Sequence, residues 1–167
     1  MEHQPDYAGS ALPRIATLDE FRLAPLGPDC VQEDFYVVVA SEAVLVGVFE
    51  DDWPLGLTLR KNRGDLERHD REFREGTAFS WVIRNESGRY LGCAYVYPDR
   101  YGDEIGRIFT WMRARADREE LLDRFNRVFE AWLLPQMPDA RDMRWRSNYD
   151  ADLDAWRDEG SPGISAA

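Results

Sequence analysis

Cysteine, lysine and long hydrophobic runs are all scarce in this sequence of 167 residues. It contains two cysteines, Cys30 and Cys93. Two thiols are too few for a disulfide scaffold, and their separation excludes the Cys-x-x-Cys spacing of zinc and redox sites. We therefore expect two buried free thiols. Lys61 is the one lysine, so arginine carries almost all of the positive charge.

The apolar runs are short. The longest, near residues 36–40 and 43–49, fall far below the roughly 18 residues that a membrane-spanning helix needs. The first ten residues carry Glu2, Pro5 and Asp6, where a signal peptide has basic residues followed by an apolar stretch. These absences predict a cytoplasmic protein with no membrane partner.

Positive charge is also in short supply. The chain has 21 Lys and Arg residues against 32 Asp and Glu residues, which gives a formal net charge of −11 and a pI near 4.7. Nucleic acids and anionic membranes bind clustered positive charge, so neither is expected as a partner. The balance favours a cationic ligand, such as an amine, over an anionic one.

What the sequence does contain is the composition of a globular domain. Apolar residues make up 44% and aromatic residues 13%, enough for a packed core in one domain of this length. Residues 1–16 mix proline, glycine and polar residues without periodicity, which predicts a flexible leader. We expect a single domain over residues 17–160 and a disordered tail over residues 161–167.

Hydrophobic periodicity predicts an alternation of strands and helices. Apolar and alternating stretches predict strands at 21–26, 77–84, 89–97, 105–113 and 143–146. Apolar residues spaced three and four apart predict one helix after Asp29 and others at 58–74, 117–134 and 149–159.

Connections and caps follow from the same pattern. Helix crossovers place the strands that they join parallel, whereas the hairpin at 85–88 pairs its strands antiparallel, so the fold class is α/β or α+β with a mixed sheet. Asp29 is expected to cap the first helix. Asp117 and Glu120 are expected to form a capping box, and Gly76 to end the second helix.

The order of elements, with the Leu-Gly stretch at residues 91–96 ending a hairpin and Asn148 preceding a last helix, resembles that of the GNAT superfamily. These proteins are acetyl-CoA-dependent N-acetyltransferases, and the resemblance extends from about Phe21 to Gly160. It implies a mixed, mostly antiparallel central sheet flanked by helices, with the last two strands of the family truncated here. It also implies transfer of an acetyl group from acetyl-CoA to an amine of a small molecule or protein.

The resemblance further implies where acetyl-CoA binds. The family signature, Gln or Arg followed by x-x-Gly-x-Gly/Ala, aligns with residues 113–118, where Arg113 matches and Ala116 and Arg118 replace the two small positions. By resemblance, backbone groups of residues 109–112 hold the pantetheine arm and arginine side chains hold the phosphates. The implied cofactor-binding residues are Phe109, Trp111, Met112, Arg113, Arg115, Arg118 and Asn148.

His69 is the first candidate for the chemistry. It lies on one side of the second predicted helix together with Asp65 and Glu72, so it is expected to contact or deprotonate a bound amine while these carboxylates orient it. The alternative is a solvated helix face with ion pairs that include Arg68. One helix supplies at most part of a coordination shell, so no metal is expected.

Tyr95 and Glu104 are the other two catalytic candidates. Tyr95 shares a strand face with Tyr97 and is expected to hold a water or amine near the thioester, or else to form the edge of the core. Glu104 precedes a strand, where the resemblance implies a base that acts through water. An acidic turn explains Glu104 equally well.

Two departures from the family pattern support an alternative function. Asp117 places a carboxylate where a phosphate would bind, and Trp156 stands where the family has a tyrosine that protonates the leaving thiolate. The alternative is a non-catalytic GNAT-fold module that binds a small molecule or a protein and has lost the phosphate loop. An exposed strand edge after residues 143–146 would also permit a homodimer.

Overall fold

The computed structural model describes residues 12–99 and 102–150. Six strands form one sheet in the order β1-β2-β3-β4-β5-β6. The strands are β1 (Ala16–Leu18), β2 (Phe21–Pro25), β3 (Phe79–Arg84), β4 (Tyr90–Tyr97), β5 (Arg107–Met112) and β6 (Arg144–Ser147). The helices are α1 (Val31–Ala40), α2 (Glu42–Leu45), α3 (Leu59–Glu75) and α4 (Arg118–Leu133), with 3-10 turns η2 (Pro28–Cys30) and η3 (Pro138–Asp142).

The sheet is mixed and mostly antiparallel, which confirms the predicted fold class. Strands β1 to β5 pair antiparallel in chain order, and only β6 pairs parallel, with β5. The crossover rule holds for β5 and β6, which α4 connects. It is wrong for β2 and β3, because the chain leaves and re-enters the sheet at the same end, where Pro25 lies opposite Trp81.

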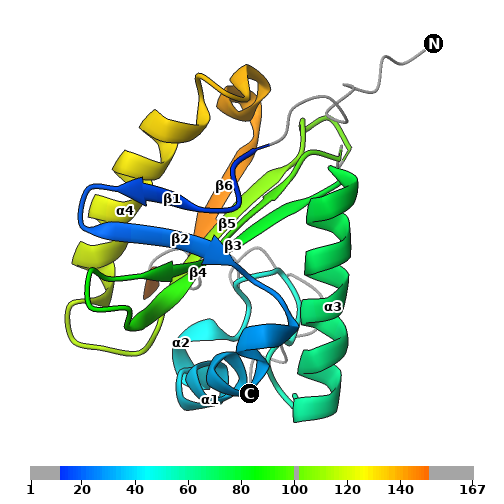
Figure 1. Cartoon of the computed structure of the whole chain (residues 1–167), viewed down its shortest axis with the longest axis vertical. Helices are drawn as coiled ribbons and strands as arrows, with labels where there is room; N and C mark the ends of the chain where they lie inside the picture. Colours follow the sequence, from blue (N-terminus) through cyan, green and yellow to red (C-terminus); the bar gives the residue numbers. More distant parts are fainter. Residues whose placement is uncertain (1–11, 100–101, 151–167) are drawn as a thin grey trace.

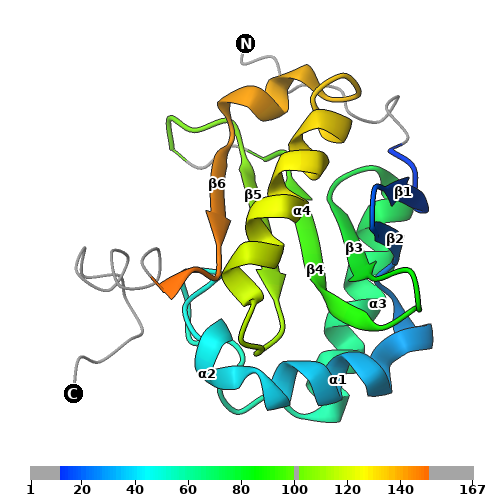
Figure 2. The same cartoon turned by 90° about the vertical axis from the view of Figure 1, so that its left-hand side faces the viewer.

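Helices cover both faces of the sheet. Helix α4 lies on one face and α3 on the other, while α1 and α2 lie across the end of the sheet (Figures 1 and 2). Alternation along β4 sends Ala94 and Val96 into the core shared with α4, and Cys93 and Tyr95 into the core shared with α1 and α3. The sheet therefore separates two hydrophobic cores.

Helix α3 begins and ends as its sequence predicts. The Thr58 side chain accepts a hydrogen bond from the backbone N–H of Lys61 at 3.2 Å, and Gly76 closes the helix with φ of +72°.

The two acidic caps are not formed. Helix α1 follows a 3-10 turn that contains Asp29, with Cys30 as its N-cap and no side-chain cap. At α4 the carboxylate of Asp117 binds the guanidinium of Arg115 instead of a backbone N–H. An adjacent cation competes with the helix terminus for that carboxylate.

Residues 12–16 belong to the fold, so the predicted leader is wrong for this stretch. Leu12 is buried, the Trp81 indole donates to the backbone oxygen of Pro13 at 2.9 Å, and Arg14 pairs with Asp70 at 2.5 Å. Strand β1 has three residues, too few to show alternation, and the sequence pattern does not predict it. Residues 1–11, the helix expected beyond residue 150 and the tail at 161–167 lie outside the described residues.

Cys93 is buried as predicted, whereas Cys30 is only partly covered. Within residues 12–99 and 102–150, no helix combines the length and the apolar character that crossing a bilayer requires.

Candidate functional site

A cavity of about 570 Å³ opens between α3, the C-terminal part of β4, the start of β5 and the segment that follows α2. Five aromatic side chains line it: Phe49, Trp53, Tyr95, Tyr97 and Phe109. Phe49 is central, with ring centroids 4.9 Å from Trp53, 5.0 Å from Tyr95 and 5.1 Å from Phe109. These edge contacts give the cavity a rigid apolar wall.

The remaining lining is strongly acidic. Two arginines, Arg68 and Arg107, face the cavity together with six carboxylates: Asp34, Glu50, Asp51, Asp65, Glu72 and Asp99. Burial is the main reason that the pKa values of Asp51 and Asp65 are raised. A carboxylate that loses water without gaining a full ion pair is stabilised by an incoming cation.

Asp34 joins three elements at the back of the cavity. It lies on α1 and is 3% exposed, accepts a hydrogen bond from the Asn62 side chain of α3 at 2.8 Å, and accepts a short one from the Tyr90 hydroxyl of β4. Its burial raises the pKa of the carboxyl. Asp34 was not among the residues predicted from the sequence, although an acid on the apolar side of a helix was the signal for it.

His69 lies on α3 with 8% of its surface exposed, and its ring centroid is 5.5 Å from that of Tyr95. Burial lowers the pKa of His69 to about 3, so the imidazole is neutral near pH 7. Among the described residues it has no hydrogen-bond partner. The cavity thus contains a neutral, nearly buried acceptor nitrogen without a protein donor.

The structure brings two of the three catalytic candidates together. His69 and Tyr95 both line the cavity, whereas Glu104 does not and instead lies 3.7 Å from Arg107. The expected support of His69 by Asp65 and Glu72 is wrong, because each of these carboxylates pairs with Arg68, at 3.8 and 3.7 Å. The ion pairs of the alternative interpretation are therefore present on α3, and the side chains that form them also line the cavity. A catalytic role for any of these residues stays a prediction.

Tyr95 remains a phenol in this setting. Its hydroxyl accepts a hydrogen bond from the Trp111 indole at 3.1 Å, and burial raises the pKa of Tyr95 well above its usual value. Trp111 is fully buried and supports Tyr95 from behind. It does not wall an open cleft.

At the end of β5, where the pantetheine arm is expected, the backbone of Met112 is bound by the side chain of Asn148. Its side-chain oxygen accepts from the backbone N–H of Met112 at 3.0 Å, and its side-chain nitrogen donates to the Met112 oxygen at 2.9 Å. Phe109 and Trp111 lie opposite Tyr95 and Cys93 in the pairing of β5 with β4. Further along the chain, the backbone N–H of Ala114 donates to the Ser41 hydroxyl at 3.0 Å.

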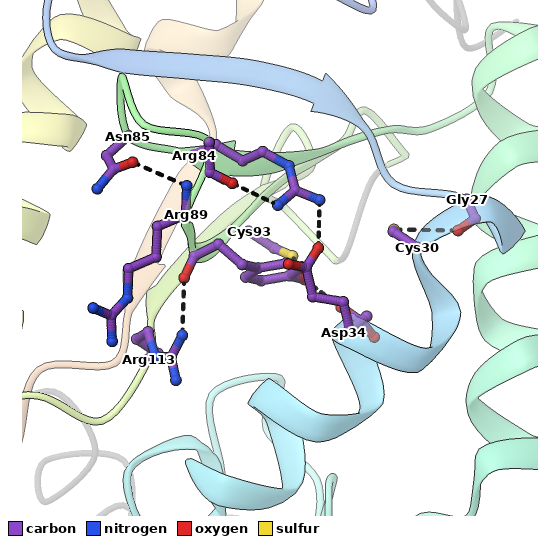
Figure 3. A network of polar contacts seen from close by, with 11 residues as sticks. Gly27, Cys30, Asp34, Arg84, Asn85, Arg89, Cys93 and Arg113 are labelled. Carbon is purple, nitrogen blue, oxygen red and sulfur yellow. Dashed lines mark hydrogen bonds and ion pairs between the residues drawn. The ribbon is translucent and has the colours of Figure 1, made fainter.

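The three arginines expected at the phosphates are bound within the chain. Arg113 donates to the backbone oxygen of Tyr90 at 3.2 Å, as Figure 3 shows. Arg115 pairs with Asp117. Arg118 is buried and donates to the backbone oxygen of Asn148 and to the Asp150 carboxylate. Their binding to phosphate stays a prediction.

No family model and no curated protein sequence matches the chain. Its structure is similar to that of the ribosomal L7/L12 alpha-N-protein acetyltransferase RimL in complex with coenzyme A, with a TM-score of 0.63 at 12% identity over 87% of this chain and 81% of that one. The microcin C7 self-immunity acetyltransferase MccE, in complex with acetyl-CoA and AMP, gives a TM-score of 0.62 at 12% identity over 88% and 81% of the two chains.

These similarities define the class of fold. The chain has the fold of the GNAT acetyltransferases, which confirms the resemblance seen in the sequence. In this fold Arg107 and Phe109 near the start of β5 line the acidic, aromatic cavity, whereas the Asn148 contact lies at Met112, the last residue of the same strand.

Proposed function

We propose that this protein transfers an acyl group to a cationic amine, and that the cavity beside α3 binds the amine. The observation that carries the proposal is the cavity itself, in which His69, Tyr95 and six acidic side chains meet an aromatic wall. Similar structures hold acetyl-CoA or coenzyme A, so acetyl-CoA is the proposed donor.

The lining of the cavity favours an acceptor with a compact positive charge. Apart from Asp34, whose burial favours the protonated form, five carboxylates and two arginines line the cavity surface, and aromatic faces attract ammonium groups. A volume of about 570 Å³ suits a small amine or a single side chain of a protein. The net charge of −11 adds a longer-range attraction for such a cation.

The side chains suggest how an amine would be positioned. An amine must be neutral to attack a carbonyl, and the neutral His69 nitrogen is suited to accept a hydrogen bond from its N–H. A pKa near 3 makes His69 a poor final carrier of the proton. We therefore assign His69 to orientation and expect a carboxylate or water to take up the proton.

The chemistry of the donor side fits one part of acetyl-CoA. The Met112 backbone already binds a carboxamide, that of Asn148, and the pantetheine arm presents amides of the same kind. The diphosphate fits poorly, because Asp117, Glu119 and Glu120 place carboxylates at the start of α4. When bound, acetyl-CoA would supply the activated acyl group.

The test is acetylation of putrescine, tyramine and a lysine peptide. The reaction is measured through the free thiol that acetyl-CoA releases on transfer. We expect Asp65→Asn to lower kcat/KM about tenfold, since it removes a cavity carboxylate (a loss of about 1.4 kcal/mol). Glu67→Gln, an exposed change on the same helix, is the matched control and should have no effect.

Two results would count against this function. If none of the three amines binds in calorimetry, the cavity is not an acceptor site. If an amine binds and the Asp65→Asn variant weakens it, yet no thiol is released at millimolar acetyl-CoA, the alternative of a non-catalytic binding module is correct.

A further inference from the structure

The pairing of β5 with β6 continues beyond the strands through a side chain. Backbone pairing ends where Thr110 lies opposite Ser147. The next residue of the chain, Asn148, turns its carboxamide to Met112, the next residue of β5 on that edge. It accepts one hydrogen bond and donates another, at 3.0 and 2.9 Å. An extended ligand with a backbone-like amide would form the same two bonds.

Other contacts hold this carboxamide in place. The same side-chain nitrogen also donates to the backbone oxygen of Val44, at 3.1 Å, and Asn148 is fully buried. Arg118 fixes the backbone of Asn148 and reaches Asp150 at 2.8 Å. Asp150 in turn donates its N–H to Glu119 at 3.0 Å. Contacts from α2 to the side chain and from α4 to the backbone thus converge on Asn148.

The neighbouring position of the same edge is also taken. Two residues beyond Met112, the N–H of Ala114 donates to the Ser41 hydroxyl at 3.0 Å. Both backbone positions at which β5 could pair with something beyond β6 are therefore capped by side chains of this chain. Each polar group is satisfied, so nothing in the fold requires a ligand there.

We propose that the Asn148 side chain occupies the position on the edge of β5, at Met112, where the acyl donor binds, and controls access to that position. An acyl carrier with an amide pairs with Met112 only when the Asn148 side chain leaves that position. The inference rests on the proposed function, because it concerns the edge of β5 assigned to the donor. It reverses the role that the family resemblance implies for Asn148, since removal of a cofactor ligand weakens binding whereas removal of an occupant strengthens it.

The experiment is calorimetric titration of pantetheine, without any amine, into the wild-type protein and the Asn148→Ala variant. We expect the variant to bind pantetheine about tenfold more tightly. The matched control is Asn126→Ala. Asn126 also makes side-chain hydrogen bonds between α4, β5 and β6, to Thr110 and Ser147, but none to Met112, and its loss should leave pantetheine affinity unchanged.

Three results would each overturn the proposal. The folded Asn148→Ala variant could bind pantetheine more weakly than the wild-type protein, it could bind with unchanged affinity, or it could show no binding at millimolar pantetheine. Where the variant does not fold, nuclear magnetic resonance of the wild-type protein decides. Saturating pantetheine should shift the side-chain amide signals of Asn148, and unshifted signals with pantetheine bound would overturn it. Because these measurements contain no amine, they test the role of Asn148 separately from acetyl transfer. The proposal for Asn148 can be wrong while acetylation is observed, and it can be right while acetylation is absent.

Discussion

At the scale of single residues, burial decides what each ionisable group can do. His69 is a residue that often titrates near neutral pH, yet its burial between α3 and β4 keeps it neutral. Asp34 shows the opposite case, since burial raises the pKa of its carboxyl and favours the protonated form. The same desolvation therefore produces a neutral base and a carboxyl that resists ionisation.

The shift at His69 predicts a pH dependence of stability. The pKa is about 3 in the folded state and 6.5 as the ordinary value, so below pH 6.5 the unfolded chain takes up a proton that the folded chain does not. The free energy of unfolding therefore falls as the pH drops from about 6.5 toward 3. The raised pKa of Asp34 acts in the opposite direction, because the stability that it contributes is lost as the pH rises through that pKa. Asp34 is present both in the wild-type protein and in a variant at position 69, so its contribution cancels when the two are compared.

We expect the stability advantage of wild type over His69→Gln to shrink by up to about 1.4 kcal/mol per pH unit between about pH 6 and pH 4. Urea unfolding at several pH values measures this difference. An advantage that stays constant over this range would mean that His69 is solvated and titrates normally.

At the scale of elements, close approach of two strands explains the glycine of the Leu-Gly stretch. A Cβ at Gly92 on β4 would lie 1.8 Å from the backbone oxygen of Trp111 on β5. Because this neighbour is backbone, it cannot move aside without opening the sheet. Gly64, on the exposed side of α3, has open space where a Cβ would lie.

These two glycines predict opposite effects of the same substitution. Gly92→Ala should cost more than about 3 kcal/mol, through the steric conflict with β5. Gly64→Ala should stabilise the protein by about 1 kcal/mol, because alanine favours the helix interior. Urea denaturation measures both, and a mild effect at Gly92 would show that the two strands can separate at this point.

At the scale of the whole molecule, the excess of 11 negative charges and the acidic cavity act in the same direction. The global field raises the local concentration of cations, and in the proposed function the cavity carboxylates bind them at short range. Screening by salt weakens the first effect strongly and the second partly. A homodimer through the β6 edge stays a prediction, as does a cytoplasmic location.

This combination predicts that choline binding weakens by roughly threefold to tenfold between about 50 and about 500 mM sodium chloride. Its neutral isostere 3,3-dimethylbutanol has the same shape without the charge, so its affinity should not fall with salt. Titration calorimetry measures both. Equal salt dependence of the two ligands would show that the cavity selects shape and not charge.

Much of the fold was predictable from local patterns. The apolar stripe of α4 and the Gly76 signal at the end of α3 are short-range features, and the structure has them. The antiparallel pairing of β2 with β3 was not predictable, since it depends on where a long connection re-enters the sheet. The site was predicted in part: His69 and Tyr95 meet at the cavity, whereas Asp34 joins it through contacts distant in the chain.

The sequence by itself determined the fold class, the acidic character and most of the helices and strands, because periodicity, caps and net charge are properties of neighbouring residues or of simple sums. Only the tertiary structure decided which charges are buried and which backbone groups are already bonded. The pKa of His69 and the carboxamide of Asn148 on Met112 depend on atoms that folding brings together from distant segments. For this protein, those two facts decide what the cavity beside α3 and the edge of β5 can do in the proposed function.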